Sequence, residues 1–298
     1  MAKPAKYKGI NQVSGTDRLL VSLMVLVPTA IVLWLVWVPA VGSVLLSFTS
    51  WDGIGPIRDA KIIGFQNYVD VATIYPPFRP AIEHNIIWLA VMFLIATPLG
   101  MFLAVLIDKG VRGGRFYQTA LYLPVVLSAA LVGFIWQLIY SKDQGFLNAV
   151  TGLNVDWYGD SNVNLWAVLV AATWRHAGYI MLLYLAGLKG VDPSLREAAR
   201  VDGANERTIF FRVVFPVMRP INMIVLVVTV IESLRAFDLV WVVNKGRNGL
   251  ELIATLVTQN VVGEASRIGF GSALATIMLL ISSVFIAIQL RVVMREDK

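Results

Sequence analysis

Six long apolar runs constrain this chain more than any other feature of its sequence. Each is long enough to cross the roughly 30 Å hydrocarbon core of a bilayer, which takes about 20 helical residues. Only 15% of the residues are charged, against about a quarter in a soluble domain. Because helices satisfy their own backbone hydrogen bonds in lipid, the sequence predicts an all-α integral membrane protein with six transmembrane helices. The expected spans lie near 19–48, 82–107, 117–140, 162–188, 216–243 and 270–293.

The distribution of Lys and Arg predicts how these helices are oriented. If the N-terminus is inside, the inner segments hold sixteen of the 25 Lys and Arg residues and the outer loops hold seven, with Arg175 and Arg235 inside spans. This excess follows the positive-inside rule and predicts cytoplasmic N and C termini. Residues 1–18 are expected to form a cytoplasmic tail. The net charge of +6 is then a result of topology, and nucleic acid is not an expected partner.

Motifs for catalysis and cofactor binding are absent from the sequence. It has no Gly-x-x-x-x-Gly-Lys-Ser/Thr phosphate loop and no cysteine for a disulfide or a thiolate ligand. Its two histidines, His84 and His176, fall in different spans, so a zinc site is not expected. We therefore expect no catalytic residue, metal or cofactor on this chain. An intramembrane aspartyl protease, which needs only two carboxylates, is disfavoured but stays open at this stage.

A charged island at 189–220 separates two of the apolar runs and predicts a pair of short helices. Asp192 is a suitable N-cap with Pro193 at the first helical position, and Gly203 supplies a left-handed residue where the first helix, 193–202, ends. Asn205 is the expected cap of a second helix, and Pro216 is expected to close the segment. A stiff pair of short helices moves as one body, so this island suits the transmission of force to a soluble partner.

The same island resembles the EAA loop of permease subunits in binding-protein-dependent ABC importers. The resemblance rests on Glu197-Ala198-Ala199, Asp202-Gly203-Ala204 and Phe215-Pro216. The flanking Ala186-Gly187-Leu188 and Phe237-Asp238-Leu239 are similar to the sugar branch, of the maltose and glycerol-3-phosphate type. Weaker matches occur upstream at Gly64-Phe65-Gln66-Asn67-Tyr68 and Leu123-Pro124.

This resemblance implies a type I ABC importer fold in the inner membrane, with one permease domain at 19–298 and a cytoplasmic coupling loop at 189–215. It implies a translocation pathway for a mono- or oligosaccharide or a related polyol, delivered by an extracytoplasmic binding protein. The implied partners are a second permease, usually a different chain, and two ATPase subunits that use ATP and Mg. It further implies ATPase coupling through Glu197, Ala198, Ala199, Asp202, Gly203, Ala204 and Pro216.

Ionisable residues inside the spans are the first candidates for a solute site, because placing them in lipid costs about 2.5–3.5 kcal/mol each. Arg175 and His176 lie near mid-depth in the fourth span, and Glu232, Arg235 and Asp238 recur at i, i+3 and i+6 in the fifth. One interpretation is an ion-paired scaffold with a Glu232–Arg235 pair. The other is a cavity for sugar rings and hydroxyls, with the candidate lining Trp174, His176, Tyr179, Ser233 and Phe237.

Two alternative functions stay open at this stage. An ion- or proton-coupled secondary transporter would use buried carboxylates as relay sites, although it has no need of a stiff cytoplasmic helix pair; a channel or receptor has still less support. The second alternative is an ABC importer of a glycerol phosphate. It stays open because the basic outer loop 244–249 stands where the family has a glycine-rich turn with proline.

Overall fold

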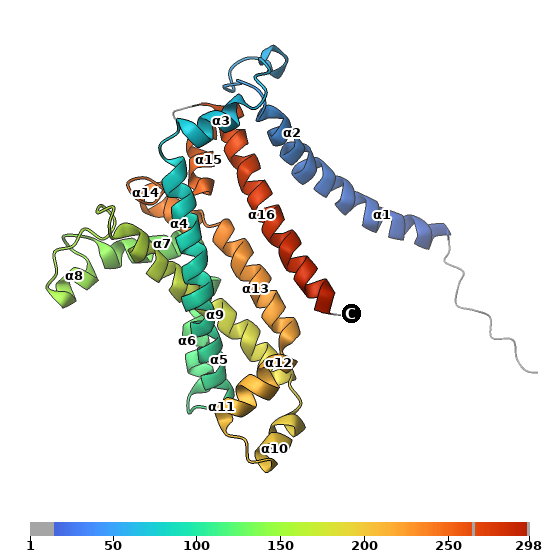
Figure 1. Ribbon diagram of the computed structural model, residues 1–298, viewed down its shortest axis with the longest axis vertical. Coiled ribbons are helices and arrows are strands. Elements are labelled where there is room, and N and C mark those ends of the chain that lie inside the picture. The colour runs from blue at the N-terminus through green and yellow to red at the C-terminus, as the bar shows by residue number, and fades with distance from the viewer. Residues whose placement is uncertain (1–14, 264–265, 297–298) are drawn as a thin grey trace, which may run out of the picture.

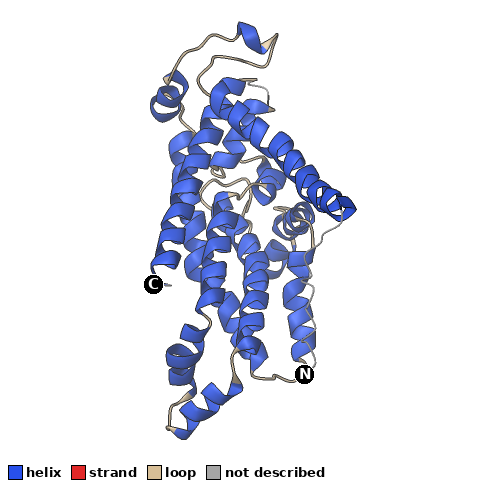
Figure 2. Cartoon of the chain, turned by 90° about the vertical axis from the view of Figure 1, so that its right-hand side faces the viewer, coloured by secondary structure: helices blue, strands red, loops and turns tan. Residues whose placement is uncertain are grey.

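The computed structural model describes residues 15–263 and 266–296 as a bundle of helices (Figures 1 and 2). Across these residues the extended backbone pairs only at one isolated bridge, Thr49 with Ile62. The predicted all-α membrane fold is thereby confirmed. The helices are α1 Gly15–Val32, η1 Leu33–Trp37, α2 Val38–Leu46, η2 Ile57–Asp59, α3 Gln66–Thr73, α4 Phe78–Val91, η3 Met92–Ala96, α5 Thr97–Asp108, α6 Gly114–Val126, α7 Ala129–Tyr140, α8 Phe146–Thr151, α9 Asn164–Gly190, α10 Pro193–Val201, α11 Glu206–Ile209, η4 Phe210–Val214, α12 Phe215–Val217, α13 Arg219–Leu234, α14 Asp238–Asn244, α15 Ile253–Val261 and α16 Ile268–Glu296.

Four helices in the described residues are long and apolar enough to cross a membrane by themselves. They are Thr16–Leu46, Phe78–Asp108, Asn164–Gly190 and Ile268–Gln289. The first two contain short π-helical turns, η1 and η3, without a break in the helix. Of the predicted tail 1–18, residues 1–14 lie outside the described part of the chain, and α1 begins at Gly15.

The third and fifth apolar runs, each predicted as one span, are bent. Gly114–Val126 and Ala129–Tyr140 meet at 104°, and Glu206–Val217 and Arg219–Asn244 meet at 77°. At the first bend Leu127 and Ser128 are extended, and the Ser128 hydroxyl accepts a hydrogen bond from the Leu131 N–H at 3.2 Å as the cap of α7. With each bent pair counted as one, residues 15–263 and 266–296 contain six helical segments long and apolar enough to cross a membrane.

Helix α9 is the most buried of the four long spans, because 56% of its apolar stretch is buried inside the molecule. Helices α5 and α6 both lie against it at glycines. A Cβ on Gly100 of α5 would come within 2.7 Å of the Ala177 carbonyl oxygen, and one on Gly178 of α9 would overlap the Leu121 carbonyl oxygen of α6. Small residues let membrane helices approach closely, so these two glycines set the spacing around α9.

The first span diverges from the rest of the bundle (Figure 1). Every residue from Thr16 to Pro39 is exposed, and contact with α16 begins only at α2. At the same end of the molecule, the Asn67 side-chain amide of α3 donates to the carbonyl oxygens of Ser47 and Thr49, both at 2.8 Å. These bonds fasten the loop 50–65 and α3 to the end of α2.

Candidate functional site

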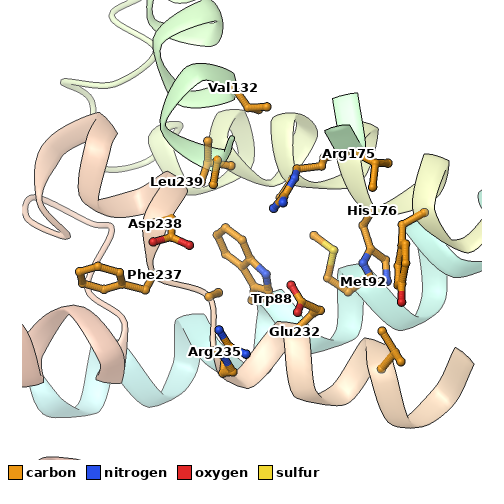
Figure 3. A pocket seen from close by; sticks show the side chains of 16 residues that line it. Trp88, Met92, Val132, Arg175, His176, Glu232, Arg235, Phe237, Asp238 and Leu239 are labelled. Atoms are coloured by element: carbon orange, nitrogen blue, oxygen red, sulfur yellow. The ribbon is translucent and has the colours of Figure 1, made fainter. Parts of the chain in front are cut away.

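A cavity of about 260 Å³ lies between α4, α6, α7, α9, α13 and α14 (Figure 3). It is bounded at two places where a span is interrupted. One is the α6–α7 bend, and the other is the segment Arg235–Phe237 between α13 and α14. Non-helical backbone at membrane depth is tolerated where it lines a cavity. The cavity is lined by Trp88, Met92, Val125, Ala129, Val132, Ala172, Arg175, His176, Tyr179, Val228, Glu232, Arg235, Ala236, Phe237, Asp238 and Leu239.

Four charged side chains face this cavity from two walls. Arg175 projects from α9, and Glu232 and Arg235 project from the facing end of α13, with Trp88 between them (Figure 3). Asp238 lies at the start of α14. Two positive and two negative groups therefore balance formally.

The expected ion pair between Glu232 and Arg235 is absent from the described residues, whose salt bridges involve other side chains. Arg175 Nε is buried and has no hydrogen-bond partner among the residues described. The interpretation of Glu232 and Arg235 as an ion-paired scaffold is therefore not supported by the structure. The cavity wall therefore holds a buried donor, Arg175 Nε, that no acceptor among the described residues satisfies.

His176 joins three spans through a short chain of hydrogen bonds. Its Nε2 lies 3.1 Å from Thr229 Oγ1 of α13, and that hydroxyl lies 3.2 Å from Thr97 Oγ1 of α5. His176 is 8% exposed and Thr229 is fully buried. The imidazole therefore both lines the cavity and fixes α9 against α13.

The structure brings three of the five predicted pathway residues to the cavity: His176, Tyr179 and Phe237. Trp174 is not in the lining; its ring meets Trp136 edge to face at 5.8 Å. Ser233 is also outside the lining, because it is 1% exposed and its hydroxyl donates to the Thr229 carbonyl oxygen at 2.6 Å.

Trp88 is the aromatic lining residue that the sequence analysis did not predict. It lies on α4, ten positions after the helix starts at Phe78, and its side chain is 4% exposed. Tryptophan in membrane proteins is enriched at the two interfaces. A tryptophan inside a span is therefore unusual, and its position could have indicated a residue that lines an interior cavity.

The second candidate site is the coupling loop, which projects from the end of the molecule opposite α3 (Figure 1). Helix α10 begins at Pro193, and the Asp192 carboxylate accepts a hydrogen bond from the Ser194 N–H at 2.9 Å. This bond lowers the pKa of the Asp192 carboxyl. Gly203 follows α10 with φ of 80°, in the left-handed region that favours glycine. The Asn205 side chain caps α11 by accepting from the Thr208 N–H at 2.8 Å.

Only some of the predicted coupling residues lie on the exposed surface of this loop. Glu197, Ala198, Asp202 and Gly203 are exposed, whereas Ala199 and Ala204 pack partly buried against the core formed with α9. Pro216 does not close the segment as predicted. It lies inside α12, and the break comes at Met218.

Membrane-length helices, an interior polar cavity at two broken spans and a projecting helix pair define a polytopic membrane transport protein. Residues 96–296 match the family described as "binding-protein-dependent transport system inner membrane component", and the chain belongs to this family. It is thus a multi-pass inner-membrane permease subunit that depends on a solute-binding partner. The resemblance inferred from the coupling loop is confirmed.

Two curated relatives are similar to this chain in sequence, and one solved structure is similar to it in fold. It is 34% identical to the osmoprotective compounds uptake permease protein GgtC of Synechocystis sp., over 82% of this chain and 88% of that one. It is 32% identical to the xylose/arabinose import permease protein XacH of Haloferax volcanii, over 80% and 76%. The fold superposes with a TM-score of 0.81 and 21% identity on a chain of a bacterial ABC transporter that imports the acidic polysaccharide alginate, over 95% and 97%.

Proposed function

We propose that this chain forms half of the translocation pathway of an ATP-driven importer for a neutral carbohydrate or polyol. A second, non-identical permease completes the pathway, and an extracytoplasmic binding protein delivers the solute. Two ATPase subunits, which hold ATP and Mg, bind at the coupling loop on the cytoplasmic side. The chain itself performs no catalysis and binds no cofactor.

The chemistry of the 260 Å³ cavity carries this proposal. Trp88, Tyr179 and Phe237 offer aromatic faces to sugar rings, and Arg175 and Glu232 offer a donor and an acceptor to hydroxyl groups. Because the four charged groups cancel formally, the cavity suits a neutral polyhydroxylated solute better than a glycerol phosphate. Xylose and arabinose, the sugars named for the relative XacH, belong to the same class.

The exposed surface of α10 supports docking of an ATPase subunit. Glu197 and Ala198 are exposed, and in the described residues the Glu197 carboxylate has no ion pair or hydrogen bond. A carboxylate free of partners within its own chain is available to a basic or amide group of another. The small side chain of Ala198 beside it permits close approach of that partner.

The exposed first span supports a second permease. Residues 16–39 of this span are exposed and diverge from their own bundle. Their course leaves room for another bundle beside α16. We propose that this span lies along the second permease. The dependence on a binding protein is a property of the family.

The test is ATP hydrolysis by the co-purified complex in proteoliposomes, with a binding protein loaded with xylose, maltose or glycerol 3-phosphate. Stimulation by a loaded sugar and not by the phosphate is the expected result. Stimulation by glycerol 3-phosphate would overturn the neutral-solute assignment. Uptake that follows an imposed proton or sodium gradient, with no co-purifying ATPase, would assign the chain to secondary transport.

A further inference from the structure

A second cavity, of about 520 Å³, lies where the end of α5 meets α10, α11 and η4. It is separate from the translocation cavity and shares none of its lining residues. One wall is apolar and includes Phe102, Val105, Phe210 and Phe211. The other carries the basic residues Lys109, Arg196, Arg200 and Arg207.

Two of the four basic residues are already neutralised within the chain. Arg196 pairs with Asp108 at 2.8 Å, and Arg200 pairs with Glu206 at 3.2 Å. Lys109 and Arg207 have no ion pair or side-chain hydrogen bond anywhere in the described residues. The cavity therefore has two uncommitted positive charges on its rim, and no acidic group of the lining is left to balance them.

The apolar wall continues onto the outer surface of the span. Phe102 is 57% exposed and Phe211 is 60% exposed, and Leu99 and Leu106 are exposed beside Phe102 on α5. Because α5 ends at Asp108, Lys109 lies where a membrane-crossing helix leaves the hydrocarbon. Lipid headgroups lie at that depth on either side of a bilayer, so the placement does not depend on the orientation of the chain.

We propose that this cavity binds an anionic phospholipid. The headgroup phosphate lies between Lys109 and Arg207, and an acyl chain lies along Phe102 and Phe211. Basic pockets at the ends of membrane helices are suited to anionic headgroups, and each Lys or Arg contributes about 1 kcal/mol there, or about fivefold in binding. Because Lys109 follows α5 and Arg207 lies on α11, the bound lipid braces α11 against the end of α5.

The first measurement is native mass spectrometry of the purified complex, delipidated and then exposed to equal amounts of dioleoyl phosphatidylglycerol and dioleoyl phosphatidylcholine. We expect about 30-fold preferential retention of phosphatidylglycerol, since two basic contacts are made. Equal retention of the two lipids overturns the proposal. Because this measurement uses the unaltered protein, it does not depend on the folding of any variant.

The second measurement compares Lys109→Gln/Arg207→Gln with the matched control Arg112→Gln/Arg212→Gln. Arg112 and Arg212 lie in the same two segments, are exposed and are not in the lining, and both variants lose the same charge. We expect the preference to fall to about equal retention in the first variant and to persist in the control. Equal loss in both variants would indicate non-specific attraction and overturn the site.

Two further measurements distinguish a bound lipid from a bound phosphate ion and from the ATPase. Phosphatidylglycerol should raise the thermal midpoint of the complex, and inorganic phosphate should leave it unchanged. Equal shifts of the midpoint by the two compounds would mean that the site binds phosphate and not lipid. Loss of the co-purified ATPase in the cavity variant, with lipid retention unchanged, would mean that the surface belongs to that partner. Stimulation of ATP hydrolysis by a loaded binding protein is measured separately, so failure of the lipid site leaves the proposed transport function untouched.

Discussion

Arg196 Nη1 donates to Asp108 Oδ2 at 2.8 Å, which ties helix α10 to the end of α5 across 88 positions of sequence. The same guanidinium donates through Nη2 to the Leu188 carbonyl oxygen of α9 at 3.2 Å. One side chain of the coupling loop thus holds the ends of two spans that reach the translocation cavity. These contacts connect α10 to α5 and α9, and we propose that a displacement of α10 acts on both spans through them.

Replacing Asp108 with Asn should weaken this connection. The two side chains are only 27% and 17% exposed, so we expect a loss of about 1–3 kcal/mol of stability, somewhat less than for a fully buried pair. Thermal unfolding in detergent measures this loss, and the solute-stimulated ATPase rate should fall with it. The control is Asp143→Asn, an exposed carboxylate. Unchanged stability and stimulation in Asp108→Asn would show that the pair transmits no force.

Replacing Gly203 with Leu should uncouple transport while the protein still inserts and folds. A Cβ at Gly203 meets nothing within 4 Å, so the cost comes from the backbone, where φ of 80° disfavours a side chain by about 1–2 kcal/mol. Asn tolerates this conformation, so Gly203→Asn is the matched control. Transport and ATPase rates measure the coupling, and normal transport by Gly203→Leu would contradict a role for this turn.

Replacing Glu197 with Lys should reduce co-purification of the ATPase without changing the stability of the permease. Glu197 is exposed on α10, and charge reversal opposes any basic partner surface. Glu197→Gln keeps a hydrogen-bonding group and separates the loss of charge from the loss of contact. The amount of ATPase retained on an affinity column decides the outcome. Full retention with Lys would remove Glu197 from the interface.

Sequence reasoning predicted the class of fold, because apolar length alone identifies membrane helices. It did not predict the bends. Ser128 is the single polar residue between Val125 and Val132, and one serine does not end an apolar run, so hydropathy does not show that Leu127 and Ser128 leave the helix. The local caps at Asp192, Gly203 and Asn205 were predictable, because each depends on its own neighbours in sequence. The tie between Arg196 and Asp108 was not, since it depends on tertiary packing.

The residues that line the cavity could be predicted in part. The two predicted residues that lie outside the lining, Trp174 and Ser233, do so for the same reason. Trp174 precedes Arg175, and Ser233 follows Glu232, so each is one position from a residue that lines the cavity. Adjacent residues of a helix point about 100° apart, and a step of one position moved both side chains into packing contacts. Only the relative rotation of α9 and α13, which the structure supplies, distinguishes lining residues from their neighbours.

Replacing Thr229 with Val should destabilise the cavity wall. The substitution keeps the shape of the side chain and removes the hydroxyl that lies 3.1 Å from His176 Nε2 and 3.2 Å from Thr97 Oγ1. Leaving a buried polar group without a partner costs about 1–3 kcal/mol. Thr229→Ser retains the hydroxyl and should retain most of the stability. If the Val variant melts with the wild type while the Ser variant melts below it, the methyl group and not the hydrogen bond is responsible.

Replacing Gly178 with Ala should separate α6 from α9. A new Cβ would overlap the Leu121 carbonyl oxygen, which is backbone and cannot rotate away. We expect a loss of about 1–3 kcal/mol, as for other overpacked contacts. Gly42→Ala is the control, because Gly42 is also helical but a Cβ there meets nothing within 4 Å; by helix propensity alone it should gain about 0.5–1 kcal/mol. Opposite shifts of the thermal midpoint are therefore expected from the same chemical change.

Equal shifts would mean that α6 and α9 are not in contact at Gly178. Val125 and Tyr179, which lie on either side of that contact, would then not form one wall of the cavity.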